Sequence, residues 1–382
     1  MTRSPRKLRF LHLHSRFDQN DVALRCVRLI DALGPDIEHT IVSADPDALD
    51  AGDRVSGAVN VHYQGVFPQL TGFPSLGRLK KLADAMRGYD LVLSYGWGAI
   101  EGAMAHTLFA QAFALPPLIH HEDALGPEEA ARLKPRRSWY RRIALGRSAS
   151  LVVPSRRLEK IATQAWAQPP ARIQRIPPGI PVSHYRKKSR PDVLPGLIKR
   201  QGESWVGTVG DLTRERNLPL LVDAFADMPD HWQLVLLGQG PERGAILKLA
   251  EGLGIEHRVH VLAPLEDMSR VLGLFDIFAL SSAHEEFPVS LIEAMAAGLP
   301  VAAAESSDIA EMVAAENRHL LCSPGDKAGL SRALHRLSVD AAARKACGSA
   351  NRAKAREQFD QEKMIARYRM LYASALCRES LP

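Results

Sequence analysis

Residues 281–303 read SSAHEEFPVSLIEAMAAGLPVAA, and this stretch decides the fold. A short apolar run within residues 276–282 predicts a buried strand that ends shortly before Glu285. Apolar residues at helical spacing then predict a helix over residues 289–297, and residues 300–304 predict another strand. A strand, a helix and a second strand in this order form the unit from which parallel sheets are built, so the stretch predicts an α/β domain.

The same alternation of short apolar runs and helical patterns extends over the rest of the chain. Upstream of the opening stretch, strands are predicted over residues 204–210, 233–238 and 258–263, and helices over residues 218–227 and 242–252 and near 268–274. Closer to the start, strands are predicted over residues 8–14, 39–44, 59–66, 90–96, 116–121, 149–155 and 173–181. One helix among them covers residues 22–33, behind Asn20 and Asp21, either of which can cap it. Two such series predict two Rossmann-like domains.

A length of 382 residues exceeds what one hydrophobic core usually serves, so two domains of ordinary size are expected. We predict a first domain over residues 1–183 and a second over residues 184–358, followed by a helix over residues 359–382 that crosses back to the first domain. The second domain opens with a polar, basic connection over residues 184–201. The returning helix is predicted because residues 340–378 are strongly helical and contain no strand pattern.

The composition is that of a globular protein, with 46% hydrophobic and 24% charged residues. No stretch approaches the roughly twenty apolar residues of a membrane span, and the apolar run near the start is too short for a signal peptide, so we expect a cytoplasmic protein. The four cysteines are far apart and form no CxxC pair or Cys/His cluster at metal spacing, which predicts reduced thiols without a zinc site. The net charge of +6 suits a phosphorylated ligand, an anionic membrane or a nucleic acid alike.

Two glutamates in the opening stretch are candidates for ligand binding. Glu285 follows the end of a predicted strand, where ligands of open α/β sheets bind, and Glu293 follows after seven residues inside the next helix. The start of that helix, at Phe287, Pro288 and Val289, offers backbone N–H groups and a positive dipole to a diphosphate. One acid would then bind the sugar and the other the ribose. Taken alone, two glutamates near a helix start are more often a solvated face that complements the dipole.

The combination of a strand, two glutamates with seven residues between them, AMAAG and PV resembles glycosyltransferase family 4, a large family of retaining enzymes with the GT-B fold. The resemblance implies two Rossmann-like domains that face each other across a cleft. It also implies transfer of a sugar from a nucleoside diphosphate sugar to a hydroxyl of a glycan or glycolipid acceptor, in polysaccharide or cell-envelope biosynthesis. No cofactor and no metal are implied. Glu285 would hold the sugar hydroxyls and Glu293 the ribose.

The second domain opens with GTVGDLTRERNLPLLVDAF over residues 207–225, which resembles the family's glycine loop. In the family, an arginine and a lysine of this loop bind the donor diphosphate. Arg216 stands at the lysine position, while the arginine position directly after Gly210 is occupied by Asp211. Arg214 in the same loop is the candidate to supply the missing charge. The alternative is that Arg214 and Arg216 are ordinary surface charges.

Other segments carry weaker resemblances. The turn at Gly238 corresponds to the family's Gly-x-Gly-Pro turn, and Glu286 stands where many members have glycine. The segment after the first strand, SRFDQNDVALR, holds none of the family's paired glycines. PPLIHH resembles the strand that delivers a sugar-contacting histidine, and its His120 and His121 point to opposite faces. We favour His121 because it lies nearer the strand end, with a structural histidine as the alternative.

One pair of aspartates has the spacing of a metal site. Asp45 and Asp47 form Asp-x-Asp, which metal-dependent transferases of a different fold use to hold a cation on the diphosphate. Two aspartates at this spacing in a proline-containing loop are usually turn formers. The resemblance to the family implies that arginine or lysine and a helix start neutralise the diphosphate, so we expect no metal site here.

A basic run interleaved with apolar residues forms, on a helix, an amphipathic cationic stripe. Its cations are Arg132, Lys134, Arg136, Arg137, Arg141, Arg142 and Arg147. Three interpretations compete: a solvated helix face, an anionic membrane surface and a nucleic-acid patch. The membrane interpretation would place the protein peripherally on the inner membrane face, next to a lipid-linked acceptor. A nucleic-acid partner is disfavoured, because nothing else in the chain resembles a nucleic-acid module.

Two other functions are compatible with these residues. A sugar-nucleotide epimerase of the same fold would bind the donor without any acceptor. A non-catalytic binding protein would explain Asp211, Glu286 and the missing glycines. Formation of an epimer without acceptor would indicate the first alternative, and tight nucleotide binding without turnover would indicate the second.

Overall fold

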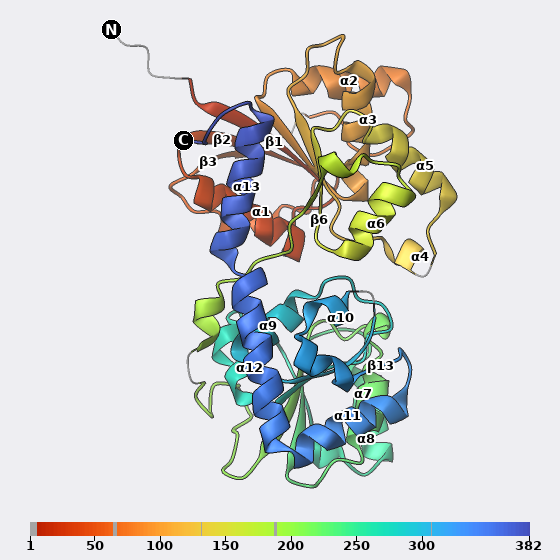
Figure 1. Ribbon diagram of the computed structural model, residues 1–382, viewed down its shortest axis with the longest axis vertical. Helices are drawn as coiled ribbons and strands as arrows, with labels where there is room; N and C mark the ends of the chain where they lie inside the picture. Colours follow the sequence, from red (N-terminus) through yellow and green to blue (C-terminus); the bar gives the residue numbers. More distant parts are fainter. Residues whose placement is uncertain (1–5, 64–66, 131, 187–188, 307) are drawn as a thin grey trace. The chain divides into compact units, whose positions relative to one another are not determined.

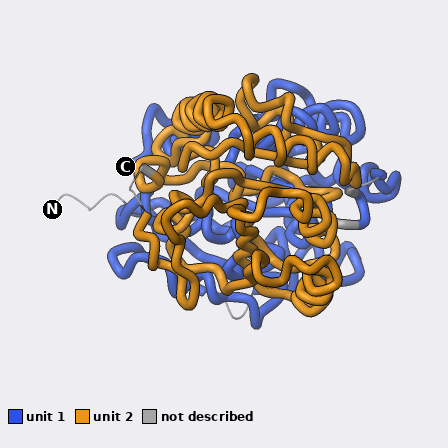
Figure 2. Tube along the Cα trace, turned by 90° about the horizontal axis from the view of Figure 1, so that it is seen from below, with its two compact units in different colours: residues 1–178, 364–382 blue, residues 179–363 orange. Residues whose placement is uncertain are grey.

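The computed structural model describes residues 6–63, 67–130, 132–186, 189–306 and 308–382. The chain forms two compact units (Figure 2). Each unit has its own hydrophobic core. Unit 1 comprises residues 1–178 and 364–382, and unit 2 comprises residues 179–363. The chain therefore changes units after residues 178 and 363, where the sequence pattern predicts boundaries after residues 183 and 358.

Unit 1 is built on a seven-stranded parallel sheet in the order β3-β2-β1-β4-β5-β6-β7 (Figure 1). Its strands are β1 (Leu8–His14), β2 (Ile37–Ser43), β3 (Asn60–Tyr63), β4 (Leu91–Tyr95), β5 (Leu118–His121), β6 (Ser150–Val153) and β7 (Ile173–Arg175). The central strands are apolar and buried along most of their length, as parallel strands with two covered faces require. The last part of the strand predicted over residues 59–66, residues 64–66, lies outside the described residues.

Helices cover the sheet of unit 1, and two core clusters fill its two faces. Its α-helices are α1 (Asp21–Leu33), α2 (Leu76–Met86), α3 (Ile100–Phe109), α4 (Pro127–Ala130), α5 (Pro135–Ala144), α6 (Arg156–Gln164) and α13 (Gln361–Ala375). In β1, Leu11 belongs to the cluster with α2 and α3, while Phe10 belongs to the cluster with α1 and α13. The Asn20 side chain accepts a hydrogen bond from the Ala23 N–H at 2.9 Å, so Asn20 is the cap of α1.

The last helix, α13, returns to unit 1 and packs beside α1 (Figure 1). The ring of Tyr372 meets Phe10 edge-on at 6.0 Å, and Arg369 donates to the carbonyl of Ala32 in α1 at 3.0 Å. Tyr368 is buried in the same cluster. The predicted packing of the C-terminal helix on the first domain is thus confirmed.

Unit 2 is built on a six-stranded parallel sheet in the order β10-β9-β8-β11-β12-β13. Its strands are β8 (Ser204–Val209), β9 (Trp232–Leu237), β10 (Val259–Leu262), β11 (Ile277–Leu280), β12 (Val301–Ala304) and β13 (Leu321–Cys322). Its α-helices are α7 (Leu218–Phe225), α8 (Arg243–Gly252), α9 (Val289–Ala297), α10 (Ile309–Met312), α11 (Lys327–Val339) and α12 (Ala341–Gln358). The helix predicted near residues 268–274 is instead two 3₁₀ turns, Met268–Arg270 and Leu272–Leu274, because Gly273 weakens a segment that is already short.

Both sheets reverse their strand order beside their first strand. In unit 1 the reversal lies between β1 and β4, and in unit 2 it lies between β8 and β11. This is the strand order of doubly wound nucleotide-binding folds, in which ligands bind outside the carboxyl ends of the strands at the reversal. We call these two places the switch points of unit 1 and unit 2.

The middle of the basic run forms α5, and its charge is not all on the surface. Arg141 is buried and lies 2.9 Å from both Glu122 and Glu129, and Arg137 lies 3.0 Å from Glu128. The prediction of a continuous cationic stripe is therefore wrong at Arg141, because two buried carboxylates hold its guanidinium inside the unit. Among the described helices, none combines the length and the apolar character needed to cross a membrane.

Candidate functional site

The candidate site is built from two loops at the switch point of unit 2. Arg216 comes from the loop after β8, and Ser282 and Glu285 come from the loop after β11. Arg216 Nη1 lies 2.5 Å from Glu285 Oε1, and Ser282 Oγ donates to Glu285 Oε2 at 2.6 Å. The sheet thereby brings together two predicted site residues that are 69 positions apart in the sequence.

This ion pair is partly open to solvent. The side chain of Arg216 is 26% exposed and that of Glu285 is 10% exposed. Both carboxylate oxygens of Glu285 are bonded, so the group is held in one orientation. A guanidinium carries several N–H donors, and its bond to Glu285 uses only part of that capacity. The pair can therefore offer a fixed acid and a cation to a ligand at the strand ends.

Two glycines let the loops after β8 and β9 pack closely around Arg216. Gly210 has a φ of 143°, and a Cβ there would lie 2.7 Å from the Arg216 guanidinium. A Cβ at Gly238 would lie 2.0 Å from the carbonyl oxygen of Gly210. A side chain at either position would push aside the loop that carries Arg216.

Helix α9 begins at Val289, just after the loop that holds Glu285, with Pro288 as its N-cap. Phe287 has a φ of 49°, which residues other than glycine rarely adopt. Its buried ring meets Phe359 edge-on at 5.8 Å, and this packing stabilises the strained backbone. The first N–H groups of α9 and its positive dipole end make the helix start a favourable place for an anion.

Glu293 lies inside α9 and has a partner that the sequence pattern does not predict. The hydroxyl of Tyr185 donates to Glu293 Oε1 at 2.6 Å. Tyr185 is buried and belongs to the 3₁₀ turn Val182–Arg186, 108 positions earlier in the chain. No local pattern connects residues this far apart. The two predicted glutamates are thus held by different groups, Glu285 by Arg216 and Glu293 by Tyr185.

Asp211 and Arg214, the other charged residues of the glycine loop, are both exposed. Arg214 begins the 3₁₀ turn Arg214–Arg216, after which Asn217 adopts a left-handed conformation with a φ of 47°. Charges at exposed positions are screened by water and salt, so each contributes little to the binding of an anion. Arg216 is therefore the cation of this loop with the largest expected effect.

In unit 1, His120 and His121 end β5 and are both buried. His121 Nδ1 donates to the Ser94 carbonyl at 3.2 Å, and its ring stacks on Tyr95 at 4.4 Å. His120 Nδ1 instead lies 2.8 Å from Ser94 Oγ. Burial lowers the pKa of His121 well below its ordinary value, so the ring is neutral. The predicted contact of His121 with a sugar stays a prediction, and it needs access to a ring that is 1% exposed.

The Asp-x-Asp pair of unit 1 forms a turn. The Asp47 N–H donates to Asp45 Oδ1 at 3.2 Å, and Asp45 Oδ2 lies 2.7 Å from Arg16 Nη1. An aspartate that bonds the backbone two residues later is a common turn former. This geometry fits the interpretation of the two residues as structural.

Comparison with known proteins assigns the two units to one class. Residues 192–354 match the family model described as glycosyl transferases group 1, and residues 20–179 match that of a glycosyl transferase 4-like domain. Together with the two parallel sheets, these matches define a glycosyltransferase of GT-B architecture. The chain belongs to glycosyltransferase family 4.

Relatives support this assignment. The N-acetyl-alpha-D-glucosaminyl L-malate synthase of Bacillus anthracis is 30% identical over 170 residues, which are 44% of this chain and 45% of that enzyme. A GDP-mannose-dependent alpha-mannosyltransferase of Mycolicibacterium smegmatis is 25% identical over 309 residues, 77% of this chain and 78% of that enzyme. The chain spans about half the length of several curated relatives that it matches, including the Bacillus enzyme.

A solved structure shows the same fold. HepE of Anabaena, in complex with UDP, is similar with a TM-score of 0.76 at 20% identity, over 97% of this chain and 100% of that chain. At this level of identity the likeness concerns the fold and not the substrate.

Proposed function

We propose that the protein transfers a sugar from a nucleoside diphosphate sugar to a hydroxyl of a glycan or lipid-linked acceptor, with retention of the anomeric configuration. The observation that carries this proposal is the pair of Arg216 and Glu285 at the switch point of unit 2, beside the start of α9. A cation for the diphosphate, an acid for the sugar and a helix start for the anion thus come from neighbouring loops. The Mycolicibacterium relative is named for a GDP-mannose donor, and HepE binds UDP, which supports a donor of this class.

The main task of unit 2 would be to stabilise the leaving group. The bond between the anomeric carbon and the diphosphate oxygen breaks while the acceptor oxygen bonds to the same face of the sugar. The departing diphosphate takes the acceptor's proton, so this step needs no separate protein base. Negative charge grows on the diphosphate, where Arg216, Arg214 and the helix start at Val289 would stabilise it.

Glu285 would hold the sugar hydroxyls. Its carboxylate is bonded to Arg216 and Ser282. A bound donor would exchange these partners, since its diphosphate attracts Arg216 and its sugar hydroxyls can donate to Glu285. Such an exchange pairs Arg216 with the charged diphosphate and leaves the Glu285 carboxylate hydrogen-bonded to hydroxyl donors, so neither partly buried ion loses its bonds.

The remaining predicted residues would orient the donor. Glu293, held by Tyr185, would accept hydrogen bonds from the ribose hydroxyls. The glycines at Gly210 and Gly238 would keep the loop that carries Arg216 packed closely at the strand ends, next to the diphosphate. His121 of unit 1 would contact an outer hydroxyl of the sugar.

We also propose that the transfer requires no metal ion, because Arg216 and the helix start supply positive charge at the diphosphate. Addition of Mg²⁺ or Mn²⁺ should leave the initial rate unchanged. A rate that rises severalfold with either ion would contradict this part of the proposal.

The function is tested with the full chain. A thermal-shift screen of nucleoside diphosphate sugars should find a donor that raises the melting temperature. That donor should then be consumed only when an acceptor is present, and nuclear magnetic resonance of the product should show the retained anomer. Formation of an epimer without acceptor would assign the protein to the epimerases. If the protein binds the nucleotide but does not consume the donor with any acceptor tested, it is a non-catalytic binding protein. Either result overturns the proposal.

A lipid-linked acceptor would bring the protein to an anionic inner membrane face, and α5 is the surface that supports this. Arg136 and Arg142 are exposed, and Trp139 between them is 63% exposed. The double variant Arg136→Gln/Arg142→Gln should sediment less with anionic vesicles, and salt should weaken sedimentation of the wild type. The double variant Arg356→Gln/Arg378→Gln removes the same charge at other exposed positions and serves as control. If both double variants sediment equally with the vesicles, α5 does not bind the membrane and is an ordinary solvated helix face.

A further inference from the structure

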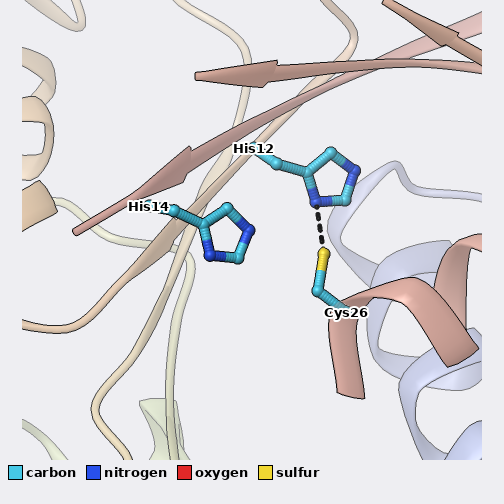
Figure 3. A group of neighbouring side chains, drawn as sticks. All are labelled: His12, His14 and Cys26. Carbon is cyan, nitrogen blue, oxygen red and sulfur yellow. Dashed lines mark hydrogen bonds between the residues drawn. The ribbon is translucent and has the colours of Figure 1, made fainter. Parts of the chain in front are cut away.

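We propose that His12, His14 and Cys26 form a binding site for a thiophilic metal cation, Zn²⁺ or Cu⁺, inside unit 1. The two histidines come from β1 and the cysteine from α1 (Figure 3). Their ligand atoms all lie within 4.8 Å of one another. The site involves none of the unit 2 residues proposed for sugar transfer, so it stands independently of that function.

The cluster forms because α1 packs on the face of β1 from which both histidines project. His12 and His14 are two positions apart in a strand, so they lie on the same face of the sheet. Cys26 follows His12 by 14 positions and approaches the histidines from the helix. All three side chains are buried, with exposures of 2%, 1% and 1%. The sequence spacing matches no familiar zinc motif, and the cluster appears only when the helix folds back on the strand.

One ligand pair already has the separation that a bound cation requires. Zn–S bonds of about 2.3 Å and Zn–N bonds of about 2.0–2.1 Å place neighbouring ligand atoms about 3.3 to 3.8 Å apart. Cys26 Sγ lies 3.3 Å from His12 Nδ1. Since the whole group fits within 4.8 Å, His14 would have to approach by at most about 1.5 Å to complete the ligand set.

A buried nitrogen of His14 provides a second, independent observation. Its Nε2 forms no hydrogen bond with any residue in the described part of the chain. The ring is turned so that one nitrogen faces His12 and Cys26 (Figure 3). Stacking on Tyr95 at 4.1 Å and an edge contact with Phe17 at 4.8 Å hold it in this orientation. A buried nitrogen without a partner costs free energy, which a metal–nitrogen bond would recover.

His12 is arranged like a metal-bound histidine. Its Nε2 lies 2.9 Å from His39 Nδ1. In the tautomer in which His12 Nε2–H donates to His39, the lone pair of His12 Nδ1 faces Cys26 and can bind a metal, as in sites where a second residue fixes the ligating ring. The Tyr95 hydroxyl borders the same group, 3.3 Å from His12 Nδ1 and 3.7 Å from Cys26 Sγ.

The ligand chemistry selects the cation. One thiolate and two imidazoles suit Zn²⁺ or Cu⁺ and not Mg²⁺ or Ca²⁺, which prefer oxygen. On binding, the S–H bond of Cys26 breaks, a sulfur–metal bond forms and the proton leaves to solvent. With one thiolate, Cu⁺ leaves the site neutral, whereas Zn²⁺ leaves one positive charge. The neighbouring Arg25 is already paired with Asp123 at 2.5 Å and 2.7 Å, so the carboxylate there is not free to balance that charge.

The test is the metal content of the full, untagged chain, because a histidine tag would bind metal itself. Protein from medium supplemented with Zn²⁺ or, separately, with copper under reducing conditions should carry about one ion per chain in at least one of the two cases. Cys26→Ala and His14→Phe should each lower this content roughly tenfold or more, and the phenyl ring of His14→Phe preserves the stack on Tyr95. Cys347→Ala removes a buried thiol of unit 2 and should retain the metal.

A second measurement keeps the proposal testable if the variants fail to fold. The wild-type chain is refolded with Co²⁺, which should produce the near-ultraviolet charge-transfer band of a cobalt thiolate. Only traces of metal in the wild type from both media, together with no such band, would overturn the site. Equal metal content in wild type and Cys26→Ala would overturn it as well, because the metal would then be bound elsewhere.

Discussion

The two units share a strand order but differ at their switch points. In unit 1, Ser15 connects the ends of β1 and β4, because its hydroxyl donates to the Tyr95 carbonyl at 3.1 Å and accepts from the Gly98 N–H at 2.8 Å. A Cβ at Gly98 would lie 2.7 Å from the Ser15 Cβ, so residues of the chain itself fill the switch point of unit 1. In unit 2, the ends of β8 and β11 carry Arg216 and Glu285, which are partly exposed.

The charged residues differ in the same way. Unit 1 encloses Arg141 with Glu122 and Glu129, whose side chains are all 1% exposed or less, so these ions are bonded to one another out of reach of a ligand. The ion pair of unit 2 is more open, because the Arg216 side chain is 26% exposed. One architecture therefore uses ionic groups for stability in one unit and, we propose, for binding in the other. Variants of unit 1 should change unfolding, and variants of unit 2 should change affinity or rate.

The largest effect is expected for Arg141→Ala in unit 1. Without the guanidinium, the buried Glu122 loses its arginine and the buried Glu129 keeps only the longer contact with Arg137 at 3.6 Å, which should lower the free energy of unfolding by about 3–5 kcal/mol. Arg142→Ala, at an exposed position of the same helix, should change it by less than about 0.5 kcal/mol. Urea unfolding followed by tryptophan fluorescence measures both. Similar small losses in the two variants would show that buried ions do not stabilise unit 1.

In unit 2 the largest expected effect belongs to Glu285→Gln. The amide keeps the size of the side chain but loses the negative charge and one acceptor, so turnover should fall roughly 100-fold. Nucleotide affinity should stay nearly unchanged, because the proposed partner of Glu285 is the sugar. Unfolding should also change little, since the ion pair is partly solvated. Initial rates, calorimetry and melting curves of Glu285→Gln are compared with those of the wild type and of Glu256→Gln, a control at an exposed position. Unchanged turnover in Glu285→Gln would refute its catalytic role.

Helix α9 shows what the sequence can predict about the fold. The range 289–297 predicted from periodicity matches the observed Val289–Ala297, because both ends are set by local residues. Pro288 stands at the N-cap position, and Gly298 ends the helix with a φ of 82°. The strand β13 has two residues, which is too short to show a hydrophobic period. The two 3₁₀ turns before β11 have apolar residues at helical spacing, so the sequence pattern predicts a helix there.

The candidate site could be predicted only where a motif places residues at adjacent strand ends. Arg216 and Glu285 meet for that reason. The bond between Tyr185 and Glu293 joins distant segments, and nothing in the sequence near either residue indicates it. Periodicity gives the position of Arg141 on its helix but not the carboxylates that the helix packs against. The cluster of His12, His14 and Cys26 in unit 1 cannot be predicted from the sequence for the same reason.

A smaller effect is expected for Arg216→Ala. Loss of a charged hydrogen-bond donor at the diphosphate should weaken nucleotide binding about tenfold. Arg214→Ala should cost less, because Arg214 is exposed and screened. Calorimetry of both variants, with Arg243→Ala as an exposed control in unit 2, separates the two positions. If Arg214→Ala has the larger effect, Arg214 is the main cation at the diphosphate, and the partly buried pair is not what distinguishes unit 2.

The smallest effect is expected at Asp211, and it decides whether Arg214 fills the place of the family's arginine. Asp211 is exposed, so Asp211→Arg should raise nucleotide affinity only about threefold, and less at high salt. Asp211→Asn removes the repulsion between the carboxylate and the diphosphate without adding a positive charge, so it separates this effect from the attraction that an arginine adds. If Arg214 already fills the place, Asp211→Arg should gain nothing in the wild type and should restore binding in Arg214→Ala. A weaker affinity in both Asp211→Arg and Asp211→Asn would mean that the carboxylate itself helps to bind the nucleotide, and the diphosphate would then lie away from this loop.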